Sequence, residues 1–465
     1  MRAITLFAIL VALGCGDDAA PVDAADASSA PDTGRADGAP PDAGMARADV
    51  GIDSGPPLDY LPAFPGADGY GTETPGGRGG RVLVVDTLDW SGPGSFSEAL
   101  YTPEPRIIVF AVSGVIDVPG DSGNLREEHS YLTIAGETSP GGITFRGGGA
   151  ALHSYRGGLH DVVVRHLRFR GRDSYDNLAL HTAHHIVIDH CDFSGGTDEA
   201  FDITFSHDYT IQWSTITNSG PTGQRYGALL AYAPTANISF HHNYSAHHAG
   251  RCAPHMHWAS SGPTEGTRVD VVRNVFYNCG HGRVLHFSNS EGVGSVLVNV
   301  VGNTAKAGPT TPVEDTTFFT NFGSFIHLYA EDNVYEPDLP FFARAYHSPT
   351  IVDAPHEGSS LGHQDRIAAR DDVLARAGAW PRDPMGERTV QQFFDGTGEL
   401  GRVSDPLITD GPTAPADADR DGMPDAWETT QGLDPADPSD AVELHASGYA
   451  WVEVYLHERA AEILP

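Results

Sequence analysis

The sequence is poor in positive charge. Its 465 residues include 28 lysines and arginines against 62 aspartates and glutamates, so the formal net charge is −34 at pH 7. A chain this acidic repels nucleic acids and anionic membrane surfaces, which excludes nucleic acid as a partner. If the ligand of the protein is also a polyanion, a bound cation has to mediate the contact.

Long apolar runs are also missing. The one marked run, Ala3–Leu13, follows a basic residue and is too short to span a bilayer, which is typical of a secretory signal. Gly14 and Cys15 follow it as at a bacterial lipoprotein cleavage site. We interpret residues 1–15 as a lipoprotein-type signal with Cys15 as the lipidated residue, and an ordinary signal peptide is the alternative. The protein would then be secreted, and only its lipid anchor would contact the membrane.

Cysteine is scarce in the rest of the chain. Apart from Cys15, the sequence contains Cys191, Cys252 and Cys279. An odd number of cysteines cannot all pair within one chain, so the pattern does not indicate a disulfide framework. We expect these three residues to be small buried side chains.

Aromatic and β-branched residues are almost missing from the segment that follows the signal. Residues 16–59 consist mostly of alanine, aspartate, glycine, proline and serine. Such a segment cannot bury enough apolar surface to fold. We interpret it as a disordered acidic linker between the anchor and a working domain.

Helix-length periodic segments are missing between the strand-like runs of residues 60–412. Short β-branched runs such as "RIIVFAVSGVIDV" and "HIVIDHCDFSG" are separated by Gly, Asn, Ser or Asp, and from Ile188 onward they recur at intervals of about 22–34 residues. This pattern predicts an all-β fold, a right-handed parallel β-helix, with a β-sandwich or propeller as the alternative. Ser95 and Glu98 form a capping box that predicts one short helix.

The acidic segment near the C-terminus has the spacing of an EF-hand or dockerin-type calcium loop. The matching residues at positions 1, 3, 5, 6, 9 and 12 are Asp417, Asp419, Asp421, Gly422, Asp425 and Glu428. Position 7 would contribute the carbonyl oxygen of Met423. Residues 413–465 are therefore predicted to form a small calcium-binding module with a structural role, in which a short helix directs Trp451, Val454 and Tyr455 into a small core.

Histidines are concentrated in residues 240–258, "FHHNYSAHHAGRCAPHMHW". A transition-metal site is one interpretation, since histidine is the commonest ligand of such metals. On a strand, however, the pairs His241-His242 and His247-His248 would each split between core and surface. We therefore favour a scaffold role, in which His242, Asn243 and similar residues stack from coil to coil as internal ladders.

Aspartates in the segment 172–203 suggest a second cation site. Asp198 and Asp202 flank a strand-like alternation, and oxygen ligands from neighbouring coils would suit calcium or magnesium. The alternative is that these aspartates only form turns.

Several ordered motifs resemble secreted bacterial pectate lyases of the first polysaccharide-lyase family, over roughly residues 61–340. The matching stretches include "AFPGADGYGTETPGGRGG", "LTIAGETSPGG", "VIDHCDFSGGTDEAFDI" and "ISFHHNYSAHHAGR". This resemblance implies a right-handed parallel β-helix that cleaves polygalacturonate by calcium-dependent β-elimination.

The resemblance also implies roles for individual residues. Asp176, Asp198 and Asp202 match carboxylates of the family's calcium site, whereas a fourth carboxylate would fall at Ser174, beside Asp173. Arg251 matches the catalytic arginine. The family's substrate-binding lysine has no clear match, and Arg225 is the nearest cationic candidate. His255 and His257 stand near the place of a second arginine and are expected to bind substrate.

The sequence therefore predicts a monomeric, surface-tethered pectate lyase with Ca²⁺ as its cofactor. The preceding features leave three alternatives open: a non-catalytic polysaccharide-binding β-helix, a lyase for a different uronic-acid polymer, and a glycoside hydrolase. A hydrolase needs two carboxylates that flank the scissile bond, and Asp198 and Asp202 could be interpreted as this pair.

Overall fold

The computed structural model describes residues 60–465 with short gaps. The gaps are at residues 121, 148–150, 156, 172–175, 221, 233, 259–264, 281–282, 290–293, 313–316, 323–324, 339–340, 342–348, 359–363 and 402–403. The predicted signal, Cys15 and the acidic linker lie outside the described residues. Within the described ranges, no helix has both the length and the apolar character needed to cross a bilayer.

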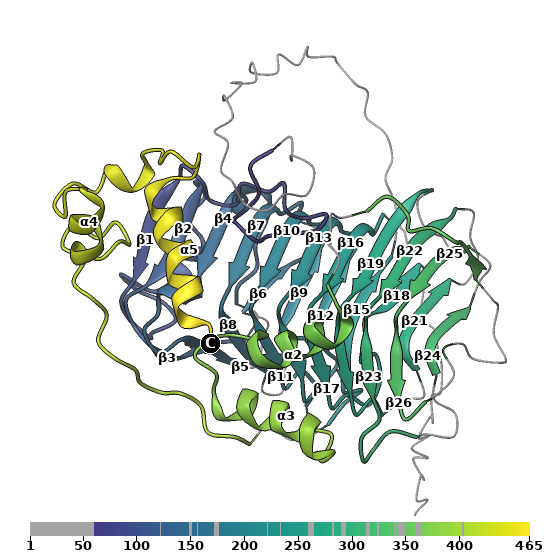
Figure 1. Ribbon diagram of the computed structural model, residues 1–465. Coiled ribbons are helices and arrows are strands. Elements are labelled where there is room, and N and C mark those ends of the chain that lie inside the picture. The colour runs from purple at the N-terminus through teal and green to yellow at the C-terminus, as the bar shows by residue number, and fades with distance from the viewer. Residues whose placement is uncertain are drawn as a thin grey trace, which may run out of the picture. The chain divides into compact units, whose positions relative to one another are not determined.

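Three parallel sheets make up most of the described chain, and successive coils of the chain visit them in turn (Figure 1). Sheet A contains β1 (Arg81–Val85), β2 (Arg106–Phe110), β4 (Leu132–Ala135), β7 (His160–Arg165), β10 (His184–Asp189), β13 (His207–Gln212), β16 (Ala236–His241), β19 (Thr267–Val272), β22 (Val296–Val301), β25 (Ile326–Glu331) and β27 (Thr350–Ile351). Sheet B contains β3 (Gly114–Val118), β5 (Ile143–Gly147), β8 (Leu167–Gly171), β11 (Asp192–Ser194), β14 (Thr215–Thr217), β17 (Tyr244–Ala246), β20 (Val275–Tyr277), β23 (Thr304–Lys306) and β26 (Val334–Glu336). Sheet C contains β6 (Leu152–Ser154), β9 (Leu178–His181), β12 (Glu199–Thr204), β15 (Tyr226–Ala231), β18 (His255–Trp258), β21 (Arg283–Asn289) and β24 (Thr317–Phe322).

The register shows that each coil lies directly on the one before it. In sheet A, Ile186 of β10 pairs with Val162 of β7 on one side and with Tyr209 of β13 on the other. The apolar side chains therefore stack in columns, as in the rings of Phe169 and Phe193, whose centroids are 4.9 Å apart. The architecture is a right-handed parallel β-helix, so that prediction is confirmed and the sandwich and propeller alternatives are wrong.

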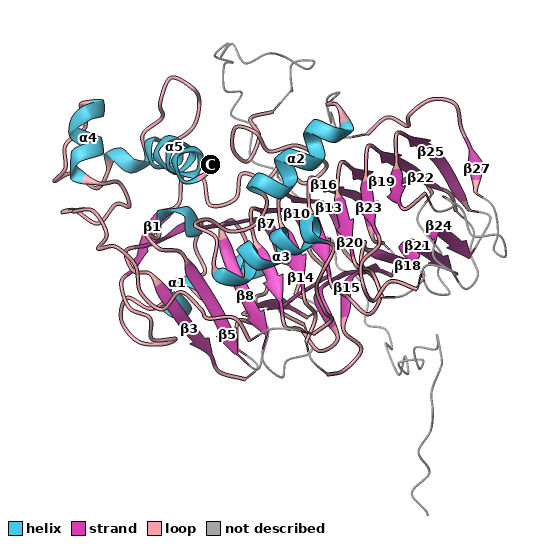
Figure 2. Ribbon diagram, turned by 60° about the horizontal axis from the view of Figure 1, so that its bottom comes forward, coloured by secondary structure: helices cyan, strands magenta, loops and turns pink. Residues whose placement is uncertain are grey.

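Helices cover parts of the outer surface (Figure 2). They are α1 (Phe96–Leu100), α2 (Arg366–Arg376), α3 (Pro384–Asp395), α4 (Asp425–Gln431) and α5 (Trp451–Ile463), with 3₁₀ turns η1 (Glu127–His129), η2 (Gly136–Thr138) and η4 (Asp440–Val442). The predicted short helix is α1, where Ser95 Oγ accepts a hydrogen bond from the Glu98 N–H. Helices α2 and α3 were not expected from the sequence. They pack Val373 and Phe393 against Tyr244 and Tyr277, which point outward from sheet B.

An asparagine ladder runs through the turns after sheet A. The side-chain amide of Asn243 donates to Asn274 Oδ1 at 3.2 Å, Asn274 donates to Asn303 at 3.0 Å, and Asn303 donates to Asn333 at 2.8 Å. Each amide also donates to a backbone carbonyl of the preceding coil, as Asn243 does to Ile211. The ladder satisfies buried polar groups coil after coil, which confirms the scaffold interpretation of Asn243.

The expected division of the histidine pairs between core and surface is wrong, because all four side chains are buried. His241 points out of sheet A, but the segment around Asp68, which precedes β1, covers it. The Nε2 atom of His241 lies 3.2 Å from the carbonyl oxygen of Asp68. His242 stacks on Trp213 with ring centroids 4.5 Å apart. Burial lowers the pKa of His241 and His248 to about 4, and the pKa of His242 and His247 to about 3.

These four histidines predict a loss of stability in mild acid. An unfolded chain protonates them near pH 6.5, whereas the folded chain keeps them neutral until about pH 4, so the unfolded state binds more protons between these values. At pH 5 each histidine should lower the free energy of unfolding by on the order of 2 kcal/mol relative to pH 7.5. Denaturant midpoints at both pH values measure this effect, and His242→Gln should reduce the pH dependence. Carboxyls with a raised pKa act on the wild-type difference in the opposite direction, so the comparison with His242→Gln is decisive, and an unchanged pH dependence in that variant would contradict the assignment.

All three cysteines are buried, as predicted, but the sequence did not indicate the disulfide that two of them form. Cys252 and Cys279 form a disulfide between neighbouring coils, with Cα atoms 5.5 Å apart, and Cys191 is a buried free thiol. An odd number of cysteines excludes complete pairing, but it allows one disulfide with one thiol left over. The disulfide fixes the residue that directly follows Arg251.

Removing this disulfide should destabilise the fold without changing its architecture. Cys252→Ala/Cys279→Ala is expected to lower the free energy of unfolding by about 3 kcal/mol, because the bond closes a loop with a sequence separation of 27 residues. Alkylation of the denatured, unreduced wild type followed by peptide mass spectrometry should modify Cys191 and leave Cys252 and Cys279 unmodified. Alkylation of all three thiols would show that the bond does not form.

Candidate active site

The outer face of sheet C carries the predicted site residues. Along β12, Phe201 and Ile203 point into the core and Asp202 points outward, as the alternation of a strand requires. The register places Asp202 between Ala179 of β9 and Leu229 of β15. The outward positions of successive coils therefore lie side by side on this face.

Four acidic side chains gather at one edge of this face. Carboxylate oxygens of Asp176, Asp198 and Glu199 lie within 4.8 Å of one another. Burial, together with the charges of Asp202 and Asp198, raises the pKa of Asp176 to about 8. Burial also raises the pKa of Asp198 and Asp202. A bound cation would offset both the burial of these carboxylates and the repulsion around Asp176.

The donor set fits a hard divalent cation such as calcium. Asp202 Oδ1 is buried and has no hydrogen-bond partner, whereas its Oδ2 lies 3.1 Å from His181 Nε2. A buried carboxylate oxygen without a partner is a position that a metal ion would satisfy. The structure thus brings the predicted ligands Asp176 and Asp198 within 4.8 Å of each other and of Glu199, whereas Asp202 interacts electrostatically with both but is not part of that group. Ser174 and Asp173, considered for a fourth ligand, lie outside the described residues.

Arg251 lies beside the acidic cluster, just before β18. Its guanidinium stands 4.4 Å from the centroid of the Tyr226 ring and forms an ion pair with Glu199. The side chain of Glu199 is nearly buried, and its backbone N–H donates to Asp176 at 3.0 Å. Glu199 therefore links the arginine to the carboxylates.

Sequence reasoning missed Glu199 and His181. The adjacent acidic pair Asp198-Glu199 was a signal for the first, although alternation along a strand would place the two on opposite faces. His181 gave no signal, because its contact with Asp202 depends on the pairing of β9 with β12, where it lies opposite Thr204.

The predicted substrate-binding residues lie on the same face at different coils. His255 Nε2 and His257 Nδ1 are 2.8 Å and 2.7 Å from Ser288 Oγ, and the His255 ring stacks on His286 of the next coil with centroids 4.2 Å apart. Arg225 immediately precedes β15, and its backbone N–H donates to the Thr197 carbonyl. Arg225 therefore belongs to the loop beside the acidic cluster, one coil before His257.

Lysine cannot supply the missing cationic group on this face. Lys306 is the single lysine of the sequence, and it lies on β23 of sheet B, where its Nζ donates to the Phe393 carbonyl. The cations and histidines near the acidic cluster are thus the groups available to bind an anionic ligand.

A cavity of about 710 Å³ lies elsewhere and is an inferior candidate. Its lining includes Arg126, Glu127, Tyr155 and His160, but none of the acidic cluster and not Arg251. The grouped carboxylates and Arg251 lie along sheet C instead, where successive coils follow one another. We therefore place the site on sheet C.

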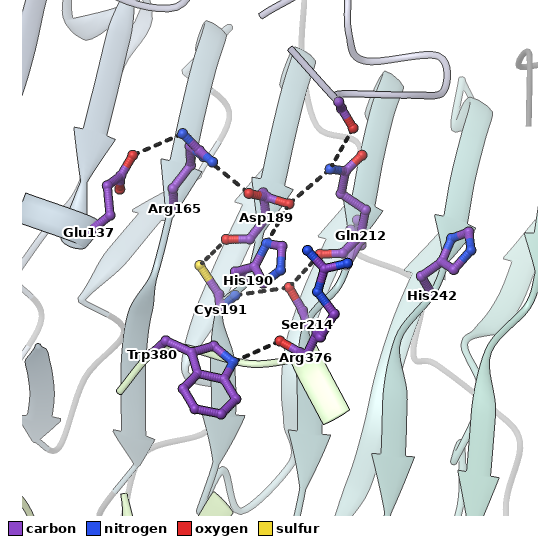
Figure 3. Close-up of polar contacts among 12 residues, drawn as sticks. Glu137, Arg165, Asp189, His190, Cys191, Gln212, Ser214, His242, Arg376 and Trp380 are labelled. Atoms are coloured by element: carbon purple, nitrogen blue, oxygen red, sulfur yellow. Dashed lines mark hydrogen bonds and ion pairs between the residues drawn. The ribbon is translucent and has the colours of Figure 1, made fainter. Parts of the chain in front are cut away.

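A second group of potential metal ligands includes Asp189 and His190, which Figure 3 shows in one network with Arg165 and Gln212. His166, Asp189 and His190 have ligand atoms within 4.8 Å. The Asp189 oxygens already accept hydrogen bonds from Arg165 Nε at 3.0 Å and Gln212 Nε2 at 2.8 Å, and His190 Nδ1 lies 2.9 Å away. Because Arg165 also brings positive charge, this group is a buried structural network that supports the coils.

The C-terminal loop brings together most of its predicted ligands. Asp417, Asp419 and Asp421 form one group within 4.8 Å, and Asp421 forms a second with Glu428 and Asp440. Asp425 is placed differently, since its Oδ1 accepts a hydrogen bond from the Ala418 N–H. Asp440 was not predicted, because it follows the loop motif by twelve residues and reaches it only through the fold.

Comparison with known proteins gives relatives along nearly the whole chain. A protein named "Probable pectate lyase C" from Aspergillus terreus is 32% identical over 421 residues, which cover 86% of this chain and 94% of the relative. The protein of the same name from Aspergillus fumigatus is 30% identical over 418 residues, covering 85% and 93%. The solved structure of jun a 1, an allergen of cedar pollen, has a TM-score of 0.45 at 14% identity and covers 67% of this chain and 92% of the allergen. No protein-family model matches the chain.

Proposed function

This chain belongs to the family of pectate lyases, and we propose that it cleaves polygalacturonate by calcium-dependent β-elimination to unsaturated oligogalacturonides. The observation that carries this proposal is the acidic cluster on sheet C, in which Asp176, Asp198 and Glu199 lie within 4.8 Å, Asp202 interacts with Asp176 and Asp198, and Arg251 pairs with Glu199. An acidic enzyme and an acidic polymer need a cation between them, and this cluster is suited to hold one.

The reaction transfers the weakly acidic hydrogen on C5 of a uronate to a base as a proton while negative charge develops toward its carboxylate. The C4–O glycosidic bond then breaks, a C4=C5 double bond forms, and the leaving oxygen takes up a proton. Calcium, held by Asp176, Asp198 and Asp202, would act as a Lewis acid toward that carboxylate. His181 orients Asp202 through the contact between Nε2 and Oδ2 at 3.1 Å. This contact leaves Oδ1 available toward the cation.

Arg251 supplies a fixed positive charge and a planar set of N–H donors next to the cluster. Its ion pair with Glu199 favours the charged guanidinium, and the Tyr226 ring holds the guanidinium by a cation–π contact. A charged arginine would stabilise the negative charge that develops on the substrate while solvent accepts the C5 proton. An Arg251 that had lost its own proton would instead accept the C5 proton itself. Arg225 and the histidines His255 and His257 would contact carboxylates and hydroxyls of neighbouring sugars along the polymer.

Incubation with polygalacturonate tests the function. A lyase produces a carbon–carbon double bond that absorbs in the ultraviolet. We expect the absorbance to increase faster when calcium is added and to stop increasing when a chelator is added. Depolymerisation without absorbance would identify a glycoside hydrolase. Binding without depolymerisation would identify a carbohydrate-binding module, and activity restricted to another uronan would change the substrate but not the reaction.

The N-terminal assignments complete the proposal. Residues 1–15 would direct secretion, lipid on Cys15 would anchor a monomeric protein outside the cell, and residues 16–59 would serve as its tether. The lyase domain would then span residues 60–412, followed by the calcium-binding module of residues 413–465. In the native host, Cys15→Ser should move the protein from the membrane fraction to the medium.

A further inference from the structure

The C-terminal acidic loop has features that its sequence motif did not contain. We propose that it binds a calcium ion with Asp440 as an additional ligand, and that this ion fastens the C-terminal segment to the first coils of the β-helix. The site is separate from the acidic cluster on sheet C, and its role would be to stabilise the fold.

Buried carboxylate oxygens without partners mark the centre of the site. Both side-chain oxygens of Glu428 and Oδ2 of Asp421 are buried and accept no hydrogen bond, and the same holds for Asp440 Oδ1 and both oxygens of Asp419. Glu428 is fully buried and Asp421 is 2% exposed. Carboxylates buried in this way are costly unless a cation or hydrogen bonds compensate them.

Electrostatics points to the same conclusion. Burial, with the charges of neighbouring carboxylates, raises the pKa of Asp421 to about 8 and the pKa of Glu428 to about 7. Arg420 lies within the loop, but its guanidinium is turned away to Asp86 at 2.8 Å. The clustered groups are all carboxylates, and such a set of hard oxygen donors is typical of a calcium site.

The loop reaches the β-helix through Gly422 and Met423. Gly422 has φ of +90°, and a Cβ atom there would approach Val82 Cγ1 of β1 to 2.9 Å, so the loop backbone lies directly on the first strand. Met423 is fully buried in an apolar cluster with Ile107 and Val109 of β2. The residues that contact the β-helix, Gly422 and Met423, therefore directly follow the ligand Asp421 in the chain.

Asp440 extends the site to the last part of the chain. It begins η4, and its Oδ2 accepts a hydrogen bond from the Asp434 N–H, which leaves Oδ1 toward Glu428 and Asp421. Beyond η4, helix α5 lies across the first strands of sheet A (Figure 1), and its Val452 and Leu456 join the same apolar cluster. Arg78 also pairs with Glu453 at 2.9 Å.

A cation at this position would therefore hold together three parts of the fold, namely the loop on β1 and β2, the helix α4 that carries Glu428, and η4 with the following α5. Without it, the repulsion among the buried carboxylates would act on the same three parts. Calcium is thus expected to stabilise the first coils as well as the loop itself.

Thermal unfolding of the full chain in calcium-free buffer and in calcium tests the proposal. We expect the wild-type Tm to rise by about 3 °C at a hundredfold excess over Kd. The rise should be lost in Glu428→Gln and strongly reduced in Asp440→Asn. It should persist in Glu443→Gln, a matched change at an exposed residue of the same segment, and in Asp202→Asn, which removes a ligand of the other site.

Hydrogen exchange then locates the effect. Calcium should increase the protection of amides in β1 and β2 as well as in residues 417–440, and Glu428→Gln should abolish both increases. A calcium response that is equal in the wild type and Glu428→Gln would overturn the site. Protection confined to residues 417–428 would overturn the fastening role, and an unaltered response in Asp440→Asn would overturn the additional ligand. These outcomes are independent of lyase activity.

Discussion

Arg251→Lys is expected to lower kcat on polygalacturonate by a factor of about 10²–10³ while KM stays nearly constant. Lysine keeps the positive charge but loses the planar fork that contacts Glu199 and lies over Tyr226. The charge would then be present but no longer held at the position where the substrate develops negative charge. Ultraviolet absorbance of the unsaturated products, measured over a range of substrate concentrations, separates kcat from KM.

Arg225→Lys is the matched control for this experiment. Arg225 lies in the loop before β15 and is assigned to substrate binding, so its substitution should change KM more than kcat. A near-normal kcat in Arg251→Lys would show that the guanidinium of Arg251 is not needed for the reaction.

Asp202→Asn should raise the calcium concentration needed for half-maximal activity by at least about tenfold, because even the loss of outer-shell partners has effects of that size. The substitution removes a charge from the cluster and disturbs the contact with His181. Activity titrated against free calcium measures the shift.

Asp208→Asn provides the comparison for Asp202→Asn. Asp208 is an aspartate on β13 of sheet A that bonds to His207 and Asn237, so the same chemical change there lies outside the site. Its calcium dependence should match that of the wild type. An unchanged calcium response in Asp202→Asn would show that the cation does not bind where we place it.

The repeat pattern was sufficient to predict the β-helix, because each coil repeats the same demands for apolar inward positions and polar turns. The ladder of Asn243 was predictable for the same reason. The four buried histidines were not, since strand alternation describes a sheet with one face in water. Here His241 is covered by the segment around Asp68, and His242 lies in a turn against Trp213. Both contacts come from residues far away in the sequence.

Within the site, residues on one strand or in one motif could be predicted, whereas pairs across coils could not. Asp198 and Asp202 belong to one short segment. Glu199, in contrast, gains its role from Arg251, which lies fifty-two residues later and approaches through the stacking of coils. Asp440 is a similar case, because the calcium-loop motif ends at Glu428 and the additional carboxylate arrives from a separate turn.

The C-terminal helix illustrates the same limit on a smaller scale. Tyr455 enters the apolar cluster as predicted and Trp451 packs partly against it, but Val452 and Leu456 take the place expected for Val454. The rotation of α5 is set by the surface of β2 and β4 on which it packs, and that surface was not visible in the local sequence.

The most direct test of the central claim is cleavage of polygalacturonate in ¹⁸O-labelled water, followed by mass spectrometry of the oligosaccharides. Elimination breaks the glycosidic bond without adding water, so each cut should give one unsaturated end, lighter by one water than a hydrolysed product. The reducing ends should carry no label beyond the slow exchange measured in an enzyme-free control. Saturated products that carry one ¹⁸O per cut would contradict the account, because they would show that the face of sheet C catalyses hydrolysis.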